Sequence, residues 1–199
     1  MRLFKNFGCC AVLCLVVHLT SGNYAFGQVI IPKADSIAMK ENIEGFYSMY
    51  LGLIKSGKLD ADFNPLFVKK KNGKAALDFT NYQAGLKKYG FSDDLIKQKT
   101  KAYDDCVSNL AKLPYDTLNW FRNGSELGLI SCEFENSYEW IGGNPDPVDR
   151  AILSMFEPLN KKMIFGQLEF FYPDSSSAGG ANITFRKIGK DWKITEVEL

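Results

Sequence analysis

The spacing of apolar residues changes midway along the chain, and this change limits the fold class more than any other feature. From Ser36 to Ile54, apolar residues recur every three or four positions, as in an amphipathic helix. We expect Asp35 to cap this helix and Gly57 to end it. From residue 129 onward, apolar and polar residues alternate, as in strands with one buried face. The order predicts an α+β fold, with N-terminal helices packed on one face of a curved antiparallel sheet formed mainly by the C-terminal half.

Two further helices are expected before the strands begin. Thr80 and Gln83 form a capping-box pattern, which starts a short helix that Gly90 ends. Ser92 then caps a longer helix, which Pro114 stops.

Turn and cap residues give expectations for two other segments. Residues 58–73 are expected to be irregular, with residues 66–68 docked on the core and a solvated lysine-rich turn at Asn72–Gly73. Further on, Asp146 is expected to cap a helix that has Pro147 at its first position. The inward stripe of this helix would consist of Val148, Ile152, Met155 and Phe156.

Alternation predicts four strands in the second half. They cover residues 129–134, 163–172, 182–188 and 192–199. Residues 189–191 form a tight hairpin between the last two. The alternation slips between Ile194 and Val197, which predicts a β-bulge there.

The N-terminus has the order of a signal peptide. Arg2 and Lys5 precede an apolar run at residues 9–19, and small residues precede Gln28. A membrane-spanning helix needs about 20 apolar residues, and this run is shorter. We therefore expect residues 1–27 to be a signal peptide and residues 28–199 to be a single domain, exported to the periplasm or secreted. An uncleaved anchor and lipidation are the alternatives.

Charge and hydropathy set the expected partners of the mature chain. Removing Arg2 and Lys5 leaves 22 basic and 23 acidic residues, a net charge of −1. Such a balance gives no long-range attraction for nucleic acid, so no nucleic-acid partner is expected. No later apolar stretch is long enough to span a bilayer, so no integral membrane domain is expected either.

Two of the five cysteines, Cys106 and Cys132, lie outside the expected signal peptide. Both fall on faces expected to be buried, and an exported chain meets an oxidising environment. The pair would form either a disulfide or two buried thiols, because sequence does not give the geometry between them.

The single histidine, His18, lies in the expected signal peptide. A mature chain without histidine excludes the Ser-His-Asp and Cys-His nucleophile arrangements and histidine-ligated zinc. No phosphate-binding glycine motif is present, so neither a cofactor nor a metal is expected.

The remaining candidates for acid–base chemistry are carboxylates. Glu133 and Glu135 would share one strand face, a pairing that can raise one pKa. An exposed face is the commoner explanation, and it also accounts for Asp104 and Asp105. The loop around Asp146 matches no calcium-binding pattern, so the helix cap is preferred there.

Aromatic residues with polar tips could line a pocket between the helices and the sheet. On helix faces such residues usually belong to the core, but a ligand pocket also has apolar walls and a few polar groups. The pocket-lining candidates are Tyr47, Tyr50, Tyr103, Trp120 and Trp140.

These features resemble a known superfamily. The long first helix carries the motif at residues 46–51, and the chain ends in a hairpin at residues 183–194 with the sequence ITFRKIGKDWKI. With the Asp146–Pro147 turn, this is similar to the nuclear-transport-factor-2-like (cystatin-like) superfamily, and within it to exported bacterial domain-of-unknown-function family 3828. The resemblance covers most of residues 36–199 and implies a cone-shaped domain. It fixes no function, because superfamily members include isomerases, dehydratases, binding proteins and immunity factors.

We therefore expect a non-enzymatic exported domain that binds either a small apolar ligand in the cone or a protein partner on the open sheet face. One alternative is an immunity-type or envelope-assembly protein that acts by occlusion. The other is an isomerase or hydratase that uses a carboxylate and a tyrosine.

Overall fold

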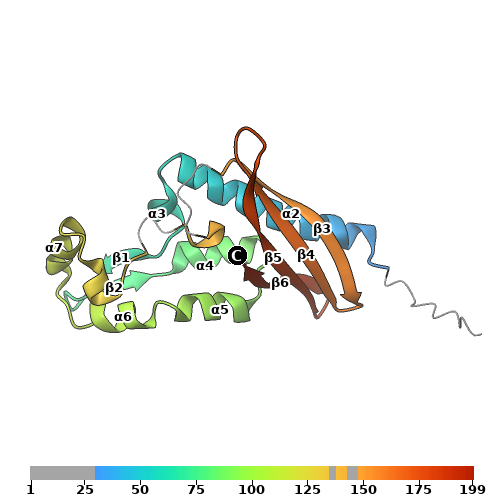
Figure 1. The fold of residues 1–199 in the computed structure, drawn as a ribbon. Coiled ribbons are helices and arrows are strands. Elements are labelled where there is room, and N and C mark those ends of the chain that lie inside the picture. The colour runs from blue at the N-terminus through green and yellow to red at the C-terminus, as the bar shows by residue number, and fades with distance from the viewer. Residues whose placement is uncertain (1–29, 135–137, 143–147) are drawn as a thin grey trace, which may run out of the picture.

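The computed structural model describes residues 30–134, 138–142 and 148–199. The first half contains α2 (Lys33–Lys55), α3 (Leu59–Asp62), β1 (Leu66–Lys69), β2 (Ala75–Asp78), α4 (Thr80–Lys88), α5 (Asp93–Lys101) and α6 (Asp104–Leu110). The second half contains the short 3₁₀ turns η1 (Tyr115–Thr117), η2 (Leu127–Ile130) and η3 (Glu139–Ile141), helix α7 (Leu118–Asn123), and strands β3 (Arg150–Asn160), β4 (Met163–Phe171), β5 (Ser177–Ile188) and β6 (Asp191–Glu198). The fold is α+β as expected, with the helices first and the main sheet last (Figure 1).

Helix α2 forms because its apolar stripe has a sheet to cover. Its buried residues are Met39, Ile43, Phe46, Tyr47, Tyr50 and Leu51. The prediction that Asp35 caps the helix is wrong: the helix begins at Lys33, and Asp35 lies in its first turn, where it accepts a hydrogen bond from Trp192 Nε1 at 2.9 Å. The predicted stop is confirmed. Gly57 has φ +66°, and Lys58 N donates to Leu53 O, as in a Schellman motif.

The main sheet is an antiparallel meander in the order β3-β4-β5-β6. Three of its strands were expected, although β5 begins earlier, at Ser177. The predicted bulge is confirmed: Thr184 pairs with Glu196 and Phe185 with Ile194, which leaves one extra residue in β6. Inward residues such as Ile164, Leu168 and Ile183 pack with α2 in one core.

Strand β3 replaces the helix expected after Asp146. Asp146 itself lies outside the described residues. The expected inward stripe is wrong for Ile152 and Met155, which are exposed on the side away from the core, whereas Val148 and Phe156 do pack inward. A bulge between Leu153 and Met155 places Ile152 and Met155 on the same side of the strand, three positions apart, and this spacing imitates a helical stripe.

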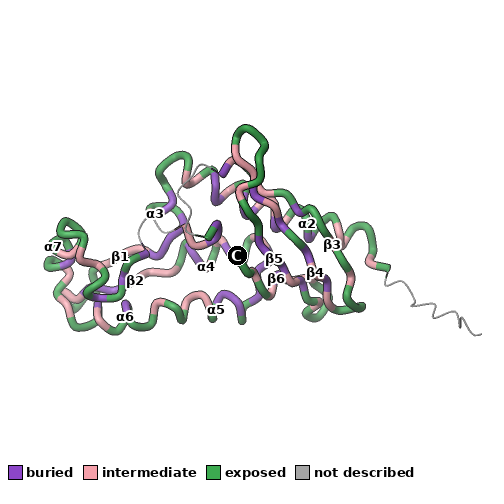
Figure 2. The backbone as a smooth tube through the Cα atoms, in the orientation of Figure 1, coloured by how far each residue is buried: buried purple, intermediate pink, exposed green. Residues whose placement is uncertain are grey.

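A second, smaller core lies at the end of the molecule away from the main sheet, and Figure 2 shows buried segments there beside β2 and α6. Its buried residues are Ala75, Cys106, Leu110, Leu118, Ile130, Cys132 and Phe134. The expected turn at Asn72–Gly73 is present, with Gly73 at φ +78°. It joins the strands β1 and β2, so the expectation of an irregular segment is wrong.

The two cores also explain why the helix expected from Ser92 to Pro114 is broken. Ser92 does cap α5, since its hydroxyl accepts from Leu95 N at 3.2 Å. The helix ends at Lys101 because α5 packs on the main core through Leu95, whereas α6 packs on the small core.

Two other local predictions were wrong. Residues 129–134 form no strand: Ser131 has φ +55° after η2, although the alternate residues Ile130, Cys132 and Phe134 are buried as expected. At the start of α4, Asp78 Oδ1 accepts from both the N–H and the hydroxyl of Thr80, in place of a capping box with Gln83. These two bonds lower the pKa of Asp78.

Candidate functional site

The aromatic pocket candidates occupy three different environments. Tyr47, Tyr50 and Trp140 are 0–1% exposed and lie in the main core. Tyr103 is half-buried beside Phe79, whereas Trp120 is 60% exposed on α7. None of the five lines the surface grooves beside α5, beside the β5–β6 turn, or between α2 and β3.

Ring packing explains why the three buried candidates enclose little space. Phe46 of α2 lies at the centre, with its ring centroid 5.2 Å from that of Tyr47, 5.9 Å from that of Tyr50 and 5.1 Å from that of Trp140. Phe91 closes another side at 4.8 Å. Aromatic pairs at these distances are close-packed, so side chains fill the space around Phe46. Toward the sheet, the Tyr47 ring packs on that of Phe170 of β4, with the centroids 5.2 Å apart.

A polar cluster that the sequence did not reveal lies next to these rings. Glu139 of η3 accepts hydrogen bonds on Oε2 from the hydroxyls of Tyr82, at 3.2 Å, and Tyr103, at 3.4 Å. Its Oε1 forms an ion pair with Lys99 Nζ at 3.0 Å. The side chains of Lys99 and Glu139 are 24% and 27% exposed. These four residues, together with Trp140, are called the Glu139 cluster below.

The electrostatics of the Glu139 cluster fix its protonation pattern. Burial, followed by the nearby charge of Glu139, raises the pKa of Tyr82 and of Tyr103 above the ordinary tyrosine value. Both phenols are therefore protonated donors at neutral pH. Because both oxygens of Glu139 already have partners, the carboxylate is not a free base, and the cluster is better suited to hold a positive charge than to move a proton.

No spacing rule could have found this cluster. Its members come from α4, α5, the turn before α6, and η3, and the fold brings them together. The carboxylates considered as acid–base candidates lie elsewhere. Glu133, Asp104 and Asp105 are exposed, as expected for acids on a solvent-facing surface. Glu135 lies outside the described residues.

The side of the main sheet facing away from α2 is the second candidate surface. We call it the outer face. Register places Ile152, Met155, Met163, Phe165 and Phe171 there, since their neighbours along the strands point into the core. Ile152 and Met155 are 37% and 39% exposed. The outer face therefore presents an apolar strip along β3 and β4.

Charges on the outer face follow a simple order along the strands. The central rows carry Glu157, Glu169, Glu196 and Glu198. Arg150 lies in the row at one end and Arg186 in the row at the other. The outer face is thus acidic across its middle and basic at its ends.

Both edges of the main sheet are partly covered. On β3, Leu153 N donates to Glu44 Oε1 of α2 at 2.9 Å, and Pro158 carries no N–H. On β6, Ile194 N donates to Gly90 O and Ile194 O accepts from Ser92 N, both at 2.9 Å. These features are typical of edges that are protected against added strands.

Comparison with known proteins gives no relative. No family model matches the chain, and no curated protein or solved structure matches it.

The described part of the chain contains no helix long and apolar enough to cross a bilayer. Nor does it bring together three or more histidine, cysteine, aspartate or glutamate side chains in a way that could hold a metal ion.

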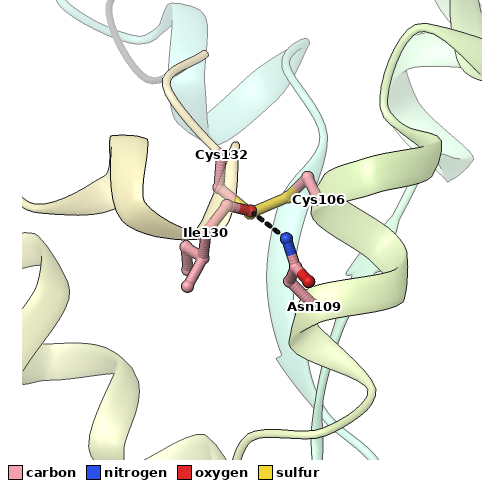
Figure 3. Close-up of a disulfide and its surroundings, with 4 residues drawn as sticks. All are labelled: Cys106, Asn109, Ile130 and Cys132. Atoms are coloured by element: carbon pink, nitrogen blue, oxygen red, sulfur yellow. Dashed lines mark hydrogen bonds between the residues drawn. A yellow bond between two sulfur atoms is a disulfide. The ribbon is translucent and has the colours of Figure 1, made fainter.

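A disulfide joins Cys106 of α6 to Cys132, with the Cα atoms 4.9 Å apart (Figure 3). Both residues are fully buried in the small core. Asn109 Nδ2 also donates to Ile130 O at 3.3 Å, so α6 contacts both the last residue of η2 and the segment that follows it. The pair is therefore structural, because no reactive thiol reaches the surface.

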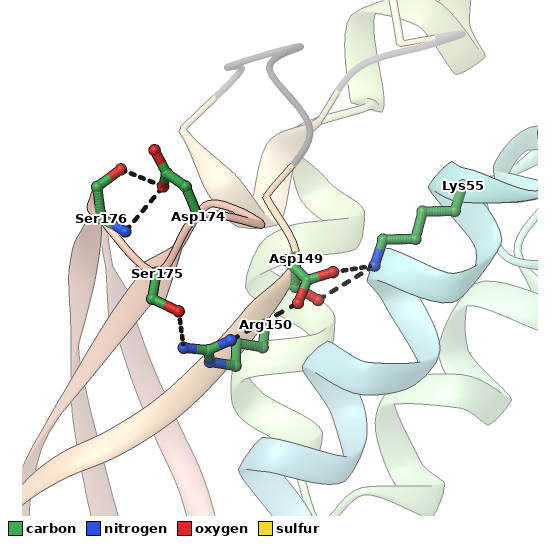
Figure 4. A network of polar contacts seen from close by, with 6 residues as sticks. All are labelled: Lys55, Asp149, Arg150, Asp174, Ser175 and Ser176. Atoms are coloured by element: carbon green, nitrogen blue, oxygen red, sulfur yellow. Dashed lines mark hydrogen bonds and ion pairs between the residues drawn. The ribbon is translucent and has the colours of Figure 1, made fainter.

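A polar network links the C-terminal end of α2 to the start of β3 and to the β4–β5 loop (Figure 4). Lys55 Nζ donates to Asp149 Oδ1 at 2.7 Å, and this hydrogen bond lowers the pKa of Asp149. Arg150 Nη2 donates to Ser175 Oγ at 2.9 Å. Arg150 Nη1 lies 3.8 Å from Asp149 Oδ2 and so connects the two contacts. These groups are exposed and contribute little to stability individually.

Proposed function

We propose that this protein is an exported, non-enzymatic domain that binds a protein partner through the outer face. The observation that carries the proposal is the apolar strip of Ile152, Met155, Met163, Phe165 and Phe171 on the solvent side of the sheet. Exposed apolar surface bordered by polar residues is typical of interaction sites, and methionine adapts to varied partners.

Charge order defines the partner that this surface would accept. Glutamates cover the middle of the outer face, and arginines lie in the rows at its two ends. The complementary surface has apolar side chains flanked by lysine or arginine at its centre. Complementary charge of this kind speeds association and selects the partner.

Three features favour docking on the outer face over the other modes. Aromatic rings pack closely around Phe46 and between Tyr47 and Phe170 of the sheet, which disfavours a small apolar ligand in a cone. The covered edges disfavour recognition by an added strand. Both oxygens of Glu139 are engaged, which disfavours a carboxylate-based isomerase. A domain of this kind would act by occlusion of its partner.

Export is part of the same proposal. Residues 1–27 have the order of a signal peptide, and a buried disulfide suits an oxidising compartment. The succession of a long helix, a hairpin and a four-stranded meander supports membership of the nuclear-transport-factor-2-like superfamily, which we also propose.

Photo-crosslinking in the native host tests the proposal. A photoreactive residue at Met155 should give one discrete crosslinked protein, and Phe165→Glu should abolish it by placing a further charge in the strip. The same photoreactive residue at Lys97, exposed on α5, is the matched control. Identical crosslinks from both positions, or a discrete crosslink that survives Phe165→Glu, would refute binding through the outer face.

A further inference from the structure

The Glu139 cluster already binds an organic ammonium group, which is the side-chain ammonium of the protein's own Lys99. Lys99 Nζ lies 3.0 Å from Glu139 Oε1 and 4.8 Å from the centroid of the Trp140 ring. A carboxylate on one side and an indole face on the other are the two elements by which proteins recognise alkylammonium ligands.

The walls of this site are held by contacts that do not involve Lys99. Hydrogen bonds from Tyr82 and Tyr103 orient the carboxylate of Glu139. Edge-on contacts with Phe46, at 5.1 Å, and Phe91, at 5.3 Å, fix the ring of Trp140, which is 1% exposed. Removal of the lysine side chain would therefore leave the carboxylate and the indole in place.

We propose that the Glu139 cluster is a binding site for small organic ammonium ions and that Lys99 is its internal occupant. The lysine is on a flexible side chain near the end of α5 and is 24% exposed, so it can leave the site without unfolding the helix. An external ammonium ion reaches Glu139 only by displacing this tethered competitor. The site uses none of the outer-face residues, so the inference stands or falls separately from the proposed function.

Titration with n-butylammonium tests the inference, with n-butanol as the neutral probe of the same shape. Binding is followed by NMR through the indole N–H signal of Trp140, assigned with the variants Trp120→Phe and Trp192→Phe. We expect Lys99→Ala to saturate at a concentration about tenfold lower than wild type, because the intramolecular competitor is gone. Lys97→Ala, on the same helix but outside the cluster, should behave as wild type.

Glu139→Gln in the Lys99→Ala background should abolish saturable binding, since the carboxylate provides the charge. A wild-type titration to higher concentration needs no lysine variant and should move the same signal in the same direction. The inference is overturned if a folded Lys99→Ala protein gives no saturable shift, if n-butanol gives the same shift, or if the double variant binds equally well.

Discussion

Glu44 Oε1 of α2 accepts a hydrogen bond from the backbone N–H of Leu153 at 2.9 Å, so a helix side chain satisfies a donor on the edge of the main sheet. This contact joins residues 109 positions apart in the chain. It also covers the edge strand next to the bulge after Leu153. The helix therefore both buries one face of the sheet and protects its edge.

Glu44→Ala should lower the free energy of unfolding by about 1–3 kcal/mol, because the N–H of Leu153 loses its partner. Exposure of the edge should also increase self-association at high protein concentration. Urea denaturation and sedimentation velocity measure the two effects. Glu44→Gln keeps an acceptor oxygen and should be closer to wild type in both; equal losses in the two variants would show that the hydrogen bond is not responsible.

Removing the disulfide should destabilise the small core selectively. A bridge between residues 26 positions apart stabilises by about 3.5 kcal/mol in the chain-entropy model. In the Cys106→Ser/Cys132→Ser variant, we expect faster hydrogen exchange in α6 and around Ile130, with β4 and β5 still protected. Uniform loss of protection over both cores would contradict their separate stabilities.

Two buried tyrosines should respond in opposite ways to loss of their hydroxyls. The Tyr82 hydroxyl donates to a carboxylate, so Tyr82→Phe should cost about 1.5–3 kcal/mol. In the described part of the chain, the buried Tyr47 hydroxyl has no hydrogen-bond partner, so Tyr47→Phe should be neutral or slightly stabilising. Chemical denaturation of the two variants at pH 7 compares them directly. Equal destabilisation would mean that the bond to Glu139 contributes nothing.

Stability should fall steeply in alkali. Burial raises the pKa of Tyr47, Tyr50, Tyr82 and Tyr103 above the ordinary value of 10.0. Below about pH 10, both folded and unfolded chains keep these protons; above it, only the unfolded chain releases them, so unfolding becomes easier. Four such groups give a slope of up to about 5 kcal/mol per pH unit. Urea denaturation between pH 8 and pH 11, with phenolate absorbance, measures this, and a flat profile would contradict the burial.

Substitutions at two adjacent positions on β3 should differ in their effect on stability, because the two side chains lie on opposite faces of the sheet. Leu153 is 8% exposed and lies in the main core, so Leu153→Ala should cost about 2–5 kcal/mol. Ile152 is on the outer face, so Ile152→Ser should cost about 1 kcal/mol or less. Thermal or chemical unfolding compares them, and the reverse order would mean that the assigned register is wrong.

The spacing of apolar residues correctly predicted the helices and strands that bury one side along their whole length. Helix α2 and strands β4, β5 and β6 each bury one regular side, so their apolar spacing indicated the correct element type. The bulge in β6 was predicted for the same reason, since one extra residue shifts an otherwise strict alternation.

Secondary structure was predicted wrongly where tertiary contacts determine the backbone conformation. The bulge in β3 gives Ile152 and Met155 helical spacing. The buried residues around Cys132 alternate without a partner strand because a disulfide and a small core hold them. The Glu139 cluster was missed because a half-buried carboxylate has no signature in a single sequence. Its partners are 36–57 positions away along the chain.

Native mass spectrometry of the protein isolated from its source is the most direct measurement of the central claim. We predict a mature chain that begins at Gln28, retains the Cys106–Cys132 bond and carries one stoichiometric protein partner. The partner should be absent from a Phe165→Glu sample of the same oxidation state. A full-length chain with free thiols, or a chain that carries only a retained small apolar molecule, would contradict the account.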